Sequence, residues 1–545
     1  MNSLFSPNRR LIIFFIILLV LTCSPIWSVE YFVNQDGSGH LHTASLIGQL
    51  LAGNDITANF YAFNSISVPN SSGHWVLLLL LQFFSPFTVT KIFVTLSYSM
   101  FVGGAGWLRY RIVGNDGVKT SLLIGAAMGF NWLWLVGFYN FMLGVIVMMF
   151  TLPFFYRRRE RFGVLDTILL SLLFTIAYLS HIVGFLVLAG SIFVLIVFTP
   201  GVRKIKTALL ASVALLPVFP LAIKFKFLSE GGSGFAPVWR SLDNPYSLAS
   251  WIHQVRVVDP FIIISRKAIP FIAETSNVFA VFTPTLWLFI AFSCLAIASI
   301  YYYRLQPESF KGHFAFFVLV AGALGLALFG PDDFDQINGG ILRERFFMCG
   351  LLFFIPLFQT GPSIRLKRIA QFCLLFIITF QTLAVWEYAL NSDKQSKVFM
   401  TASELLRKSP ASITITIREG DFRFHADPVP QLNCYNGIGT NNIVWDNYEF
   451  GHYLFPLITK NIEDRHFIHE FTRSEYLGLN DTDEAFGSFE EKLGRINSSL
   501  EPYNDRIETV VLWGKDARVE AVLNKWFESE PYFENGNIRL FHHKK

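Results

Sequence analysis

Residues 9–27 read RRLIIFFIILLVLTCSPIW, two arginines followed by an apolar segment. The segment from Leu11 to Trp27 is close to the roughly 20 residues that a helix needs to cross the ~30 Å hydrocarbon core of a bilayer. No small-x-small cleavage site follows it, and Thr22 before Cys23 fits a lipoprotein site poorly. We therefore expect an uncleaved anchor with a cytoplasmic N-terminus, and its orientation decides on which side every later loop lies.

The composition is that of a multi-pass integral membrane protein. Of 545 residues, 52% are hydrophobic and only 15% are charged, and the mean hydropathy is +0.44. The net charge of +4 is small for this length, so it does not favour a nucleic-acid partner. The cysteines occur singly, at Cys23, Cys294, Cys349, Cys373 and Cys434. Their spacing therefore predicts neither a disulfide framework nor a zinc site.

Ten further apolar segments are typical of membrane spans. They are Thr88–Leu108, Thr120–Val136, Phe141–Tyr156, Val164–Ser180, Ile182–Phe198, Thr207–Ile223, Asn277–Tyr303, Phe314–Phe329, Phe346–Phe358 and Ile369–Tyr388. Together with the first segment, they predict an all-α polytopic membrane domain of about eleven transmembrane helices.

The basic residues test this topology, because short cytoplasmic loops are enriched in Lys and Arg. With the N-terminus inside, 17 basic residues lie in short inner loops and nine lie in or beside longer outer segments. The bias holds only if the apolar stretch from His74 to Phe87 does not cross the membrane. That stretch has about 14 residues and ends in Ser85 and Pro86, which is typical of an interfacial or re-entrant helix.

The same topology predicts two domains, a transmembrane domain of residues 1–390 and a soluble extracytoplasmic domain of residues 391–545. The first domain carries two large outer loops, residues 31–87 and 224–275. In the second domain, the pattern predicts helices at Lys397–Lys408 and Ala517–Phe527 and strands at Ser412–Ile417, Thr509–Trp513 and Ile538–Phe541, the last as an edge or final strand. This alternation is typical of a small α/β or α+β domain.

The chemistry of interest begins in the first outer loop, where residues 34–42 read NQDGSGHLH. Apolar residues at helical spacing follow, so we expect an amphipathic helix along the outer membrane surface, with Asp36 and His40 one turn apart on one face. Asp36 is then a candidate general base for an acceptor hydroxyl, or a ligand for a divalent cation, and His40 a candidate for positioning substrate. The structural alternative is that Asp36 forms an Asx turn or an N-cap and that the histidines are interfacial polar residues.

Several features together resemble the GT-C membrane glycosyltransferases, which include the protein O-mannosyltransferases and the bacterial lipid A aminoarabinose transferases. These features are the cytoplasmic N-terminus, Asp36 in the first outer loop, the short Pro-bounded helix, about eleven spans, and GILRERF at residues 340–346 before a late span. The paired Asp-Glu of the mannosyltransferases is absent, since Gly37 follows Asp36, and the DxD of oligosaccharyl transferases is absent too. Two patterns are more similar to those of bacterial multi-pass proteins that are placed near GT-C by analogy. They are Asp-x3-His at Asp36 and His40, and GFYNFMLG at residues 137–144.

The resemblance implies a polyprenyl-phosphate-linked sugar donor and a catalytic acid in the first loop, which here is Asp36, with His40 beside it. Candidate substrate-binding residues are His42, Tyr139, Asn140, His181, Arg256, Arg343 and Arg345. Arg345 is the strongest candidate for the donor phosphate, because it abuts a span and a guanidinium pairs bidentately with phosphate oxygens; the alternative is a snorkelling interface residue. His181 is a site candidate because a histidine at membrane depth is costly; a histidine at a helix end that bonds to a neighbouring carbonyl explains it equally well. No motif in the sequence supports a metal site, and the cofactor is unknown.

The sequence therefore favours an integral membrane glycosyltransferase of the cell (inner) membrane. It would move a sugar from the polyprenyl-phosphate-linked donor to a glycan, lipid or protein acceptor on the outer face, among membrane lipids. The alternative is a transporter, a flippase or a non-catalytic membrane assembly protein for cell-envelope polysaccharide. Coupled transporters usually bury ionisable groups at the midplane and contain repeated halves, and neither feature is obvious in this sequence.

Overall fold

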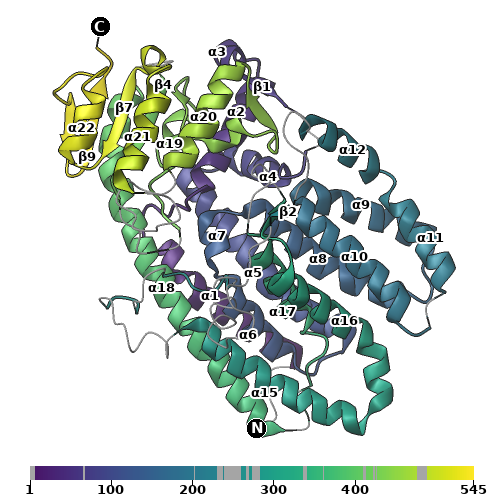
Figure 1. Cartoon of the computed structure of the whole chain (residues 1–545). Helices are drawn as coiled ribbons and strands as arrows, with labels where there is room; N and C mark the ends of the chain where they lie inside the picture. Colours follow the sequence, from purple (N-terminus) through teal and green to yellow (C-terminus); the bar gives the residue numbers. More distant parts are fainter. Residues whose placement is uncertain are drawn as a thin grey trace. The chain divides into compact units, whose positions relative to one another are not determined.

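The structure is a computed structural model, drawn in Figure 1 with its elements labelled. It describes residues 7–64, 68–201, 203–229, 237–238, 259–264, 269–272, 283–334, 341–359, 361, 363–408, 413–420, 424, 426–475 and 488–544. The chain divides into two compact units. Unit 1 comprises Met1–Pro25, Val94–Trp134 and Tyr139–Val385, and unit 2 comprises Ile26–Phe93, Leu135–Phe138 and Trp386–Lys545.

Unit 1 is mainly helical, and four of its helices (α1, α5, α7 and α18) continue into unit 2. The helices are α1 (Pro7–Trp27), α5 (Pro86–Ile112), α6 (Val118–Gly129), α7 (Trp132–Val136), α8 (Tyr139–Arg158), α9 (Val164–Ser180), α10 (Ile182–Phe198), α11 (Lys204–Leu215), α12 (Val218–Ser229), α15 (Pro284–Leu305), α16 (Pro307–Phe329), α17 (Leu342–Phe353) and α18 (Ile364–Leu406). A short antiparallel pair, β2 (Pro237–Val238) and β3 (Asp333–Phe334), accompanies them. Each apolar segment that the sequence predicts as a span contains at least part of one of these helices.

Five helices in the described part of the chain are long and apolar enough to cross a membrane: α1, α8, α15, α16 and α18. The pair α11 and α12, bent by 52°, adds a sixth if the two helices form one span. The shorter apolar helices include α6, α9 and α10. A multi-pass helical membrane protein is therefore confirmed as the fold class, whereas the number of eleven spans and their orientation stay predictions.

The predicted span Thr120–Val136 is not one helix, because Asn131 interrupts it. Helix α6 ends at Gly129 and α7 begins at Trp132. The Asn131 side-chain amide donates to the Met128 carbonyl at 3.0 Å, and its oxygen accepts from the Trp134 N–H at 3.0 Å. One side chain thus satisfies backbone groups on both sides of the break, which an apolar residue could not do.

Unit 2 contains a five-stranded sheet in the order β5-β4-β7-β9-β8. Its strands are β4 (Ile413–Arg418), β5 (Ile443–Val444), β7 (Thr509–Trp513), β8 (Phe533–Asn535) and β9 (Ile538–His542). Strands β5, β4 and β7 are parallel, and β9 pairs antiparallel with both β7 and β8. The sheet confirms a small C-terminal sheet domain. Strand β9 is the final strand of the chain, as the sequence allows, but it lies inside the sheet because β8 occupies the edge.

Helices and short strands surround this sheet in unit 2. They are α2 (Gly37–Leu51), α3 (Asp55–Phe60), β1 (Tyr61–Phe63), α4 (Ser72–Leu81), α19 (Cys434–Gly437), η1 (Tyr448–Gly451), β6 (Leu457–Thr459), α20 (Ile462–Glu475), α21 (Phe489–Leu500), η3 (Asn504–Arg506) and α22 (Ala517–Leu523). Strand β1 of the first loop pairs antiparallel with β6 of the C-terminal region. The predicted first outer loop and the C-terminal region therefore fold together, whereas the outer position of that loop and the membrane boundary at residue 390 stay predictions.

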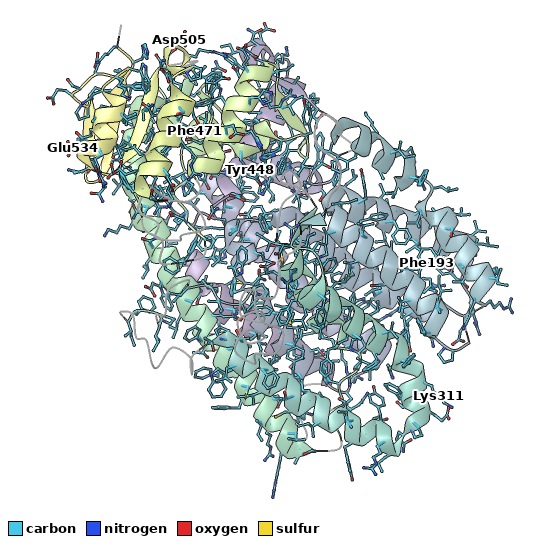
Figure 2. The ribbon with its side chains drawn as sticks, in the orientation of Figure 1. Phe193, Lys311, Tyr448, Phe471, Asp505 and Glu534 are labelled. Atoms are coloured by element: carbon cyan, nitrogen blue, oxygen red, sulfur yellow. The ribbon has the colours of Figure 1, made fainter. Side chains whose placement is uncertain are left out.

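Helix α2 is a core element of unit 2, which corrects the expected interfacial helix. Its residues Leu46 and Ile47 belong to one buried cluster with Ile415 of β4, Val510 of β7 and Phe471 of α20, the last labelled in Figure 2. The apolar periodicity of α2 correctly predicts a helix with one apolar side, but that side packs against protein. Periodicity reports that a face is buried and does not report what buries it.

Candidate metal and catalytic centre

The backbone around Asp36 is held on both sides. The N–H groups of Gln35 and Asp36 donate to the carbonyls of Leu135 (3.2 Å) and Val136 (2.6 Å), and the His40 N–H donates to the Asp36 carbonyl at 3.0 Å. The last bond closes the first turn of α2, so Asp36 and His40 lie one turn apart as expected. Residues 135–138 belong to unit 2, and they fix the loop that carries Asp36.

The Asp36 side chain does not cap its helix. Asp36 occupies the N-cap position of α2, yet its carboxylate makes no capping hydrogen bond. The side chain is only 4% exposed, and Oδ1 accepts from Gln431 Nε2 at 3.3 Å. Gly39 makes room for that amide, because a Cβ there would lie 2.0 Å from Gln431 Oε1. The carboxylate is therefore held by the C-terminal region and not by its own helix.

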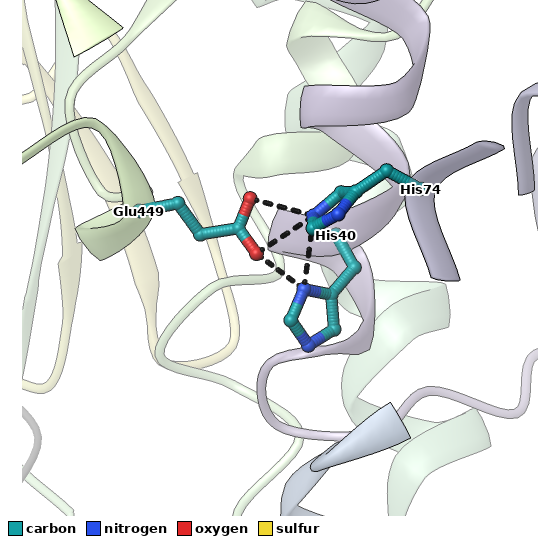
Figure 3. Close-up of side chains that lie close together, drawn as sticks. All are labelled: His40, His74 and Glu449. Atoms are coloured by element: carbon teal, nitrogen blue, oxygen red, sulfur yellow. Dashed lines mark hydrogen bonds and ion pairs between the residues drawn. The ribbon is translucent and has the colours of Figure 1, made fainter. Parts of the chain in front are cut away.

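His40, His74 and Glu449 converge in unit 2, as Figure 3 shows. His40 Nδ1 contacts Glu449 Oε1, and His74 Nε2 lies 3.0 Å from each Glu449 oxygen. The two ring nitrogens, His40 Nδ1 and His74 Nε2, are 3.3 Å apart. Glu449 and His74 are fully buried, and His40 is 3% exposed. Two imidazoles and one carboxylate thus meet in a water-poor interior, where they could hold a cation or share a proton.

Neighbouring polar groups orient this cluster. His40 Nε2 donates to the Gly137 carbonyl at 2.8 Å, and the Thr43 hydroxyl donates to Glu449 Oε2. The Glu449 N–H donates to Asn447 Oδ1 at 3.2 Å, and Asn447 Nδ2 donates to Thr43 Oγ1 at 3.0 Å. His40 and Glu449 are therefore each held by a further hydrogen bond, and the His74 ring packs edge-on against Phe455 with centroids 6.1 Å apart.

Charge perturbs both His40 and Glu449. Burial alone would raise the pKa of Glu449, but the charges and hydrogen bonds of His74 and His40 outweigh it and hold that pKa well below its usual range. Burial alone would lower the pKa of His40, but the charge and hydrogen bond of Glu449, with the charge of Asp36, raise it above 6.5. Near neutral pH, Glu449 is therefore a carboxylate that favours a positive charge beside it.

His42, predicted as a substrate-binding residue, does not join this cluster. It is fully buried, its ring packs edge-on against Phe450 with centroids 5.5 Å apart, and a Cβ at Gly437 would lie 2.2 Å from its Nε2. Among the described residues, neither ring nitrogen has a hydrogen-bond partner. Burial accordingly lowers the pKa of His42 to about 3. We therefore assign His42 to the packing between α2 and α19.

Two of the other predicted site residues, Arg345 and His181, meet in unit 1 beside Phe141, which the sequence did not single out. Arg345 Nη1 lies 3.1 Å from His181 Nε2, and the guanidinium lies over the Phe141 ring at 5.1 Å from its centroid. Arg345 is 4% exposed and His181 is 8% exposed. Phe141 follows Tyr139 and Asn140, two buried residues at the start of α8. A guanidinium, an imidazole and an aromatic face are thus brought together from α17, from the α9–α10 junction and from α8.

The contacts of Arg343 indicate a structural role. Its Nε and Nη2 donate to the Ala327 (2.7 Å) and Leu328 (2.6 Å) carbonyls at the end of α16, and Nη1 lies 3.4 Å from Asp332 Oδ1. These bonds satisfy carbonyls that the end of a helix leaves open. Arg256, the remaining predicted residue, lies outside the described residues.

The sequence did not point to Glu449, His74 or Gln431 as site residues. Glu449 lies 409 residues from His40, and His74 lies 34 residues from it, so no spacing rule connects them. His74 offered one signal, a histidine at the start of an apolar stretch, where an ionisable side chain is costly unless it has a partner. Glu449 offered none.

Comparison with known proteins gives similarity to solved structures and to no family model or curated protein. No protein-family model matches the sequence, and no curated protein matches it. Among solved structures, the chain is similar to ArnT from Cupriavidus metallidurans in the apo state, with 12% sequence identity, a TM-score of 0.48 and coverage of 98% of both chains. A similarity of this size assigns no role to any residue.

Proposed function

We propose that this protein is an integral membrane glycosyltransferase that moves a sugar from a polyprenyl-phosphate-linked donor to an acceptor on the outer face of the membrane. The observation that carries the proposal is the Asp36 carboxylate, which is buried beside His40 and is not used as a helix cap. A carboxylate can accept a proton, so Asp36 would act as the general base on the acceptor hydroxyl. His40, one turn away, would support the charge of Asp36, since Glu449 and the Gly137 carbonyl occupy its two ring nitrogens.

The Arg345 cluster supports the second half of the proposal, which is binding of the donor. A guanidinium presents a planar fork that matches two phosphate oxygens, and the Phe141 ring and His181 fix the orientation of that fork. Tyr139 and Asn140, next to Phe141, would contact the rest of the headgroup. The predicted topology puts both Asp36 and Arg345 on the outer side.

The test is the conversion of Asp36 to asparagine. Asp36→Asn keeps the shape and hydrogen-bonding capacity but removes the proton acceptor, so turnover should fall by about 10²-fold or more. Purified full-length protein in proteoliposomes would be supplied with a labelled polyprenyl-phosphate sugar, and transfer to an acceptor alcohol would be measured. Asp55→Asn is the matched control, since Asp55 is an exposed aspartate at the start of α3 and should keep full activity.

Because Asp36 makes no capping bond, the variant should be produced at normal levels. A fully active Asp36→Asn protein would overturn the assignment of Asp36. It would favour the transporter or assembly alternative.

A further inference from the structure

We propose that His40, His74 and Glu449 form a binding site for one divalent transition-metal ion, with Zn²⁺ as the best fit. Among the described residues, these three form the one group of at least three His, Cys, Asp or Glu side chains whose ligand atoms all lie within 4.8 Å of one another. The proposal concerns metal binding alone, and it stands whether or not the protein transfers a sugar.

The spacing of the ligand atoms suits a tetrahedral ion. Zn²⁺ binds imidazole nitrogen at about 2.0–2.1 Å, so two ligand atoms at tetrahedral angles are separated by roughly 3.3 Å. His40 Nδ1 and His74 Nε2 are 3.3 Å apart, and His74 Nε2 is 3.0 Å from each Glu449 oxygen. His40 and Glu449 stand closer than this, so an ion between them requires the carboxylate oxygen to move away from His40 Nδ1.

The protonation pattern of His40 also suits a ligand. A carbonyl only accepts hydrogen bonds, so His40 Nε2, at 2.8 Å from the Gly137 carbonyl, carries the ring hydrogen. In the neutral ring, Nδ1 then carries a lone pair and no hydrogen, and Nδ1 is the atom that faces His74 and Glu449. Histidine ligands in metal sites are held in this way by a backbone carbonyl on the far nitrogen.

The donor set selects the class of ion. Two imidazole nitrogens and one carboxylate oxygen form the ligand set of catalytic zinc sites, with one position left for water or substrate. Mg²⁺ and Ca²⁺ prefer oxygen ligands throughout and so fit less well. The Thr43 hydroxyl, which donates to the second Glu449 oxygen, would hold the carboxylate in a one-oxygen mode.

Without an ion, the same three groups must share protons as a buried ion pair. The buried ion pair and the metal site differ in whether the purified protein retains a metal ion. The experiment therefore uses full-length protein, purified without a histidine tag, stripped with a chelator, dialysed against ZnCl₂ and analysed by mass spectrometry for bound metal. We expect one zinc per chain, and Co²⁺ in its place should give the visible d–d band of a tetrahedral site.

Glu449→Gln and His74→Asn should each weaken zinc binding by roughly tenfold or more, since each removes a ligand. The control is His466→Ala, an exposed histidine of α20, which should bind zinc as the wild type does. Retention of no zinc by the wild type, or equal binding by Glu449→Gln, would overturn the proposal in favour of a proton-sharing pair. If Glu449→Gln does not fold, the stoichiometry and the Co²⁺ spectrum of the wild type still decide.

Discussion

His40 and His42 are separated by one residue in α2, and they meet opposite environments. At about 100° per residue, their side chains leave the helix roughly 200° apart. His40 faces the Glu449 carboxylate and its pKa is raised, whereas His42 faces Phe450 and its pKa falls to about 3. The sequence HLH does not distinguish the two histidines. Their different pKa values follow from their partners and not from the residue type.

Arg345→Lys tests the proposed donor site at the scale of one side chain. Lysine keeps the charge but loses the planar fork, and the loss of one charge-assisted hydrogen bond costs about 1.5–3 kcal/mol. We therefore expect kcat/KM for the lipid-linked donor to fall about tenfold or more at unchanged protein levels. Arg161→Lys, at an exposed arginine, is the control. Full activity of Arg345→Ala would reduce Arg345 to an interface anchor.

The carboxyl of Asp446 leads to a prediction about how the stability of the protein depends on pH. Burial raises the pKa of this carboxyl to about 6 from 3.8, although Thr416 and Asn433 donate hydrogen bonds to it. The folded protein thus holds the proton more tightly than the unfolded chain does. The contribution of Asp446 to stability is complete below pH 3.8 and is lost as the pH rises through about 6, by up to about 1.4 kcal/mol per pH unit.

Asp446→Asn removes the titrating group, so the melting temperature of the variant should depend less steeply on pH between 4 and 6 than that of the wild type. The comparison is made by thermal unfolding in detergent at a series of pH values. Parallel profiles for the two proteins would show that Asp446 is not protonated in this range.

At the scale of elements, the contact between α2 and residues 135–138 depends on Gly137. Its φ is +109°, a conformation that L side chains rarely adopt, and a Cβ there would lie 3.0 Å from the Gly37 nitrogen and 3.2 Å from Asp36 Cβ. Gly137→Ala should therefore destabilise the protein by about 1–3 kcal/mol. It should also disturb the His40 contact with the Gly137 carbonyl, and thereby weaken zinc binding.

Gly53→Ala separates the effect of the positive φ from the effect of the close contact with Gly37 and Asp36. Gly53 also has a positive φ, +77°, but nothing lies within 4 Å of a Cβ placed there. This variant should lose some stability without any loss of zinc binding. If the two alanine variants behave alike in both measurements, the contact at Asp36 has no special importance.

Helix α18 shows how elements can cross a predicted boundary. The sequence separates a span ending at Tyr388 from a soluble helix beginning at Lys397, because the composition changes between them. The structure has one helix of 43 residues, Ile364–Leu406, that includes both. No Gly or Pro occurs in this stretch, so nothing in the backbone ends the helix where the polarity changes.

For the whole molecule, the prediction concerns topology. The excess of basic residues in the short inner loops places the loop at Arg161 in the cytoplasm and the chain after Lys397 outside. Reporter fusions after these two residues should give opposite signals, inside for the first and outside for the second. A fusion after Gly114, in the preceding predicted inner loop, should agree with the first. Equal signals at Arg161 and Lys397 would refute the topology and the outer position of Asp36.

The sequence alone determined whatever depends on neighbours along the chain. Hydropathy located the apolar helices, short apolar or alternating segments located β4, β7 and β9, and helical spacing put Asp36 and His40 one turn apart. The same information could not locate the break at Asn131, because that break depends on side-chain hydrogen bonds to the backbone.

Only the tertiary structure decided which residues form the site. Glu449 reaches His40 across 409 residues, and β1 pairs with β6 across a similar distance, because the packing of the core brings the first loop and the C-terminal region together. Local preferences act within a few residues, whereas burial of apolar surface acts between any segments that can close around it. The sequence therefore identified Asp36 and His40 as candidates, and packing supplied His74, Glu449 and Gln431 around them.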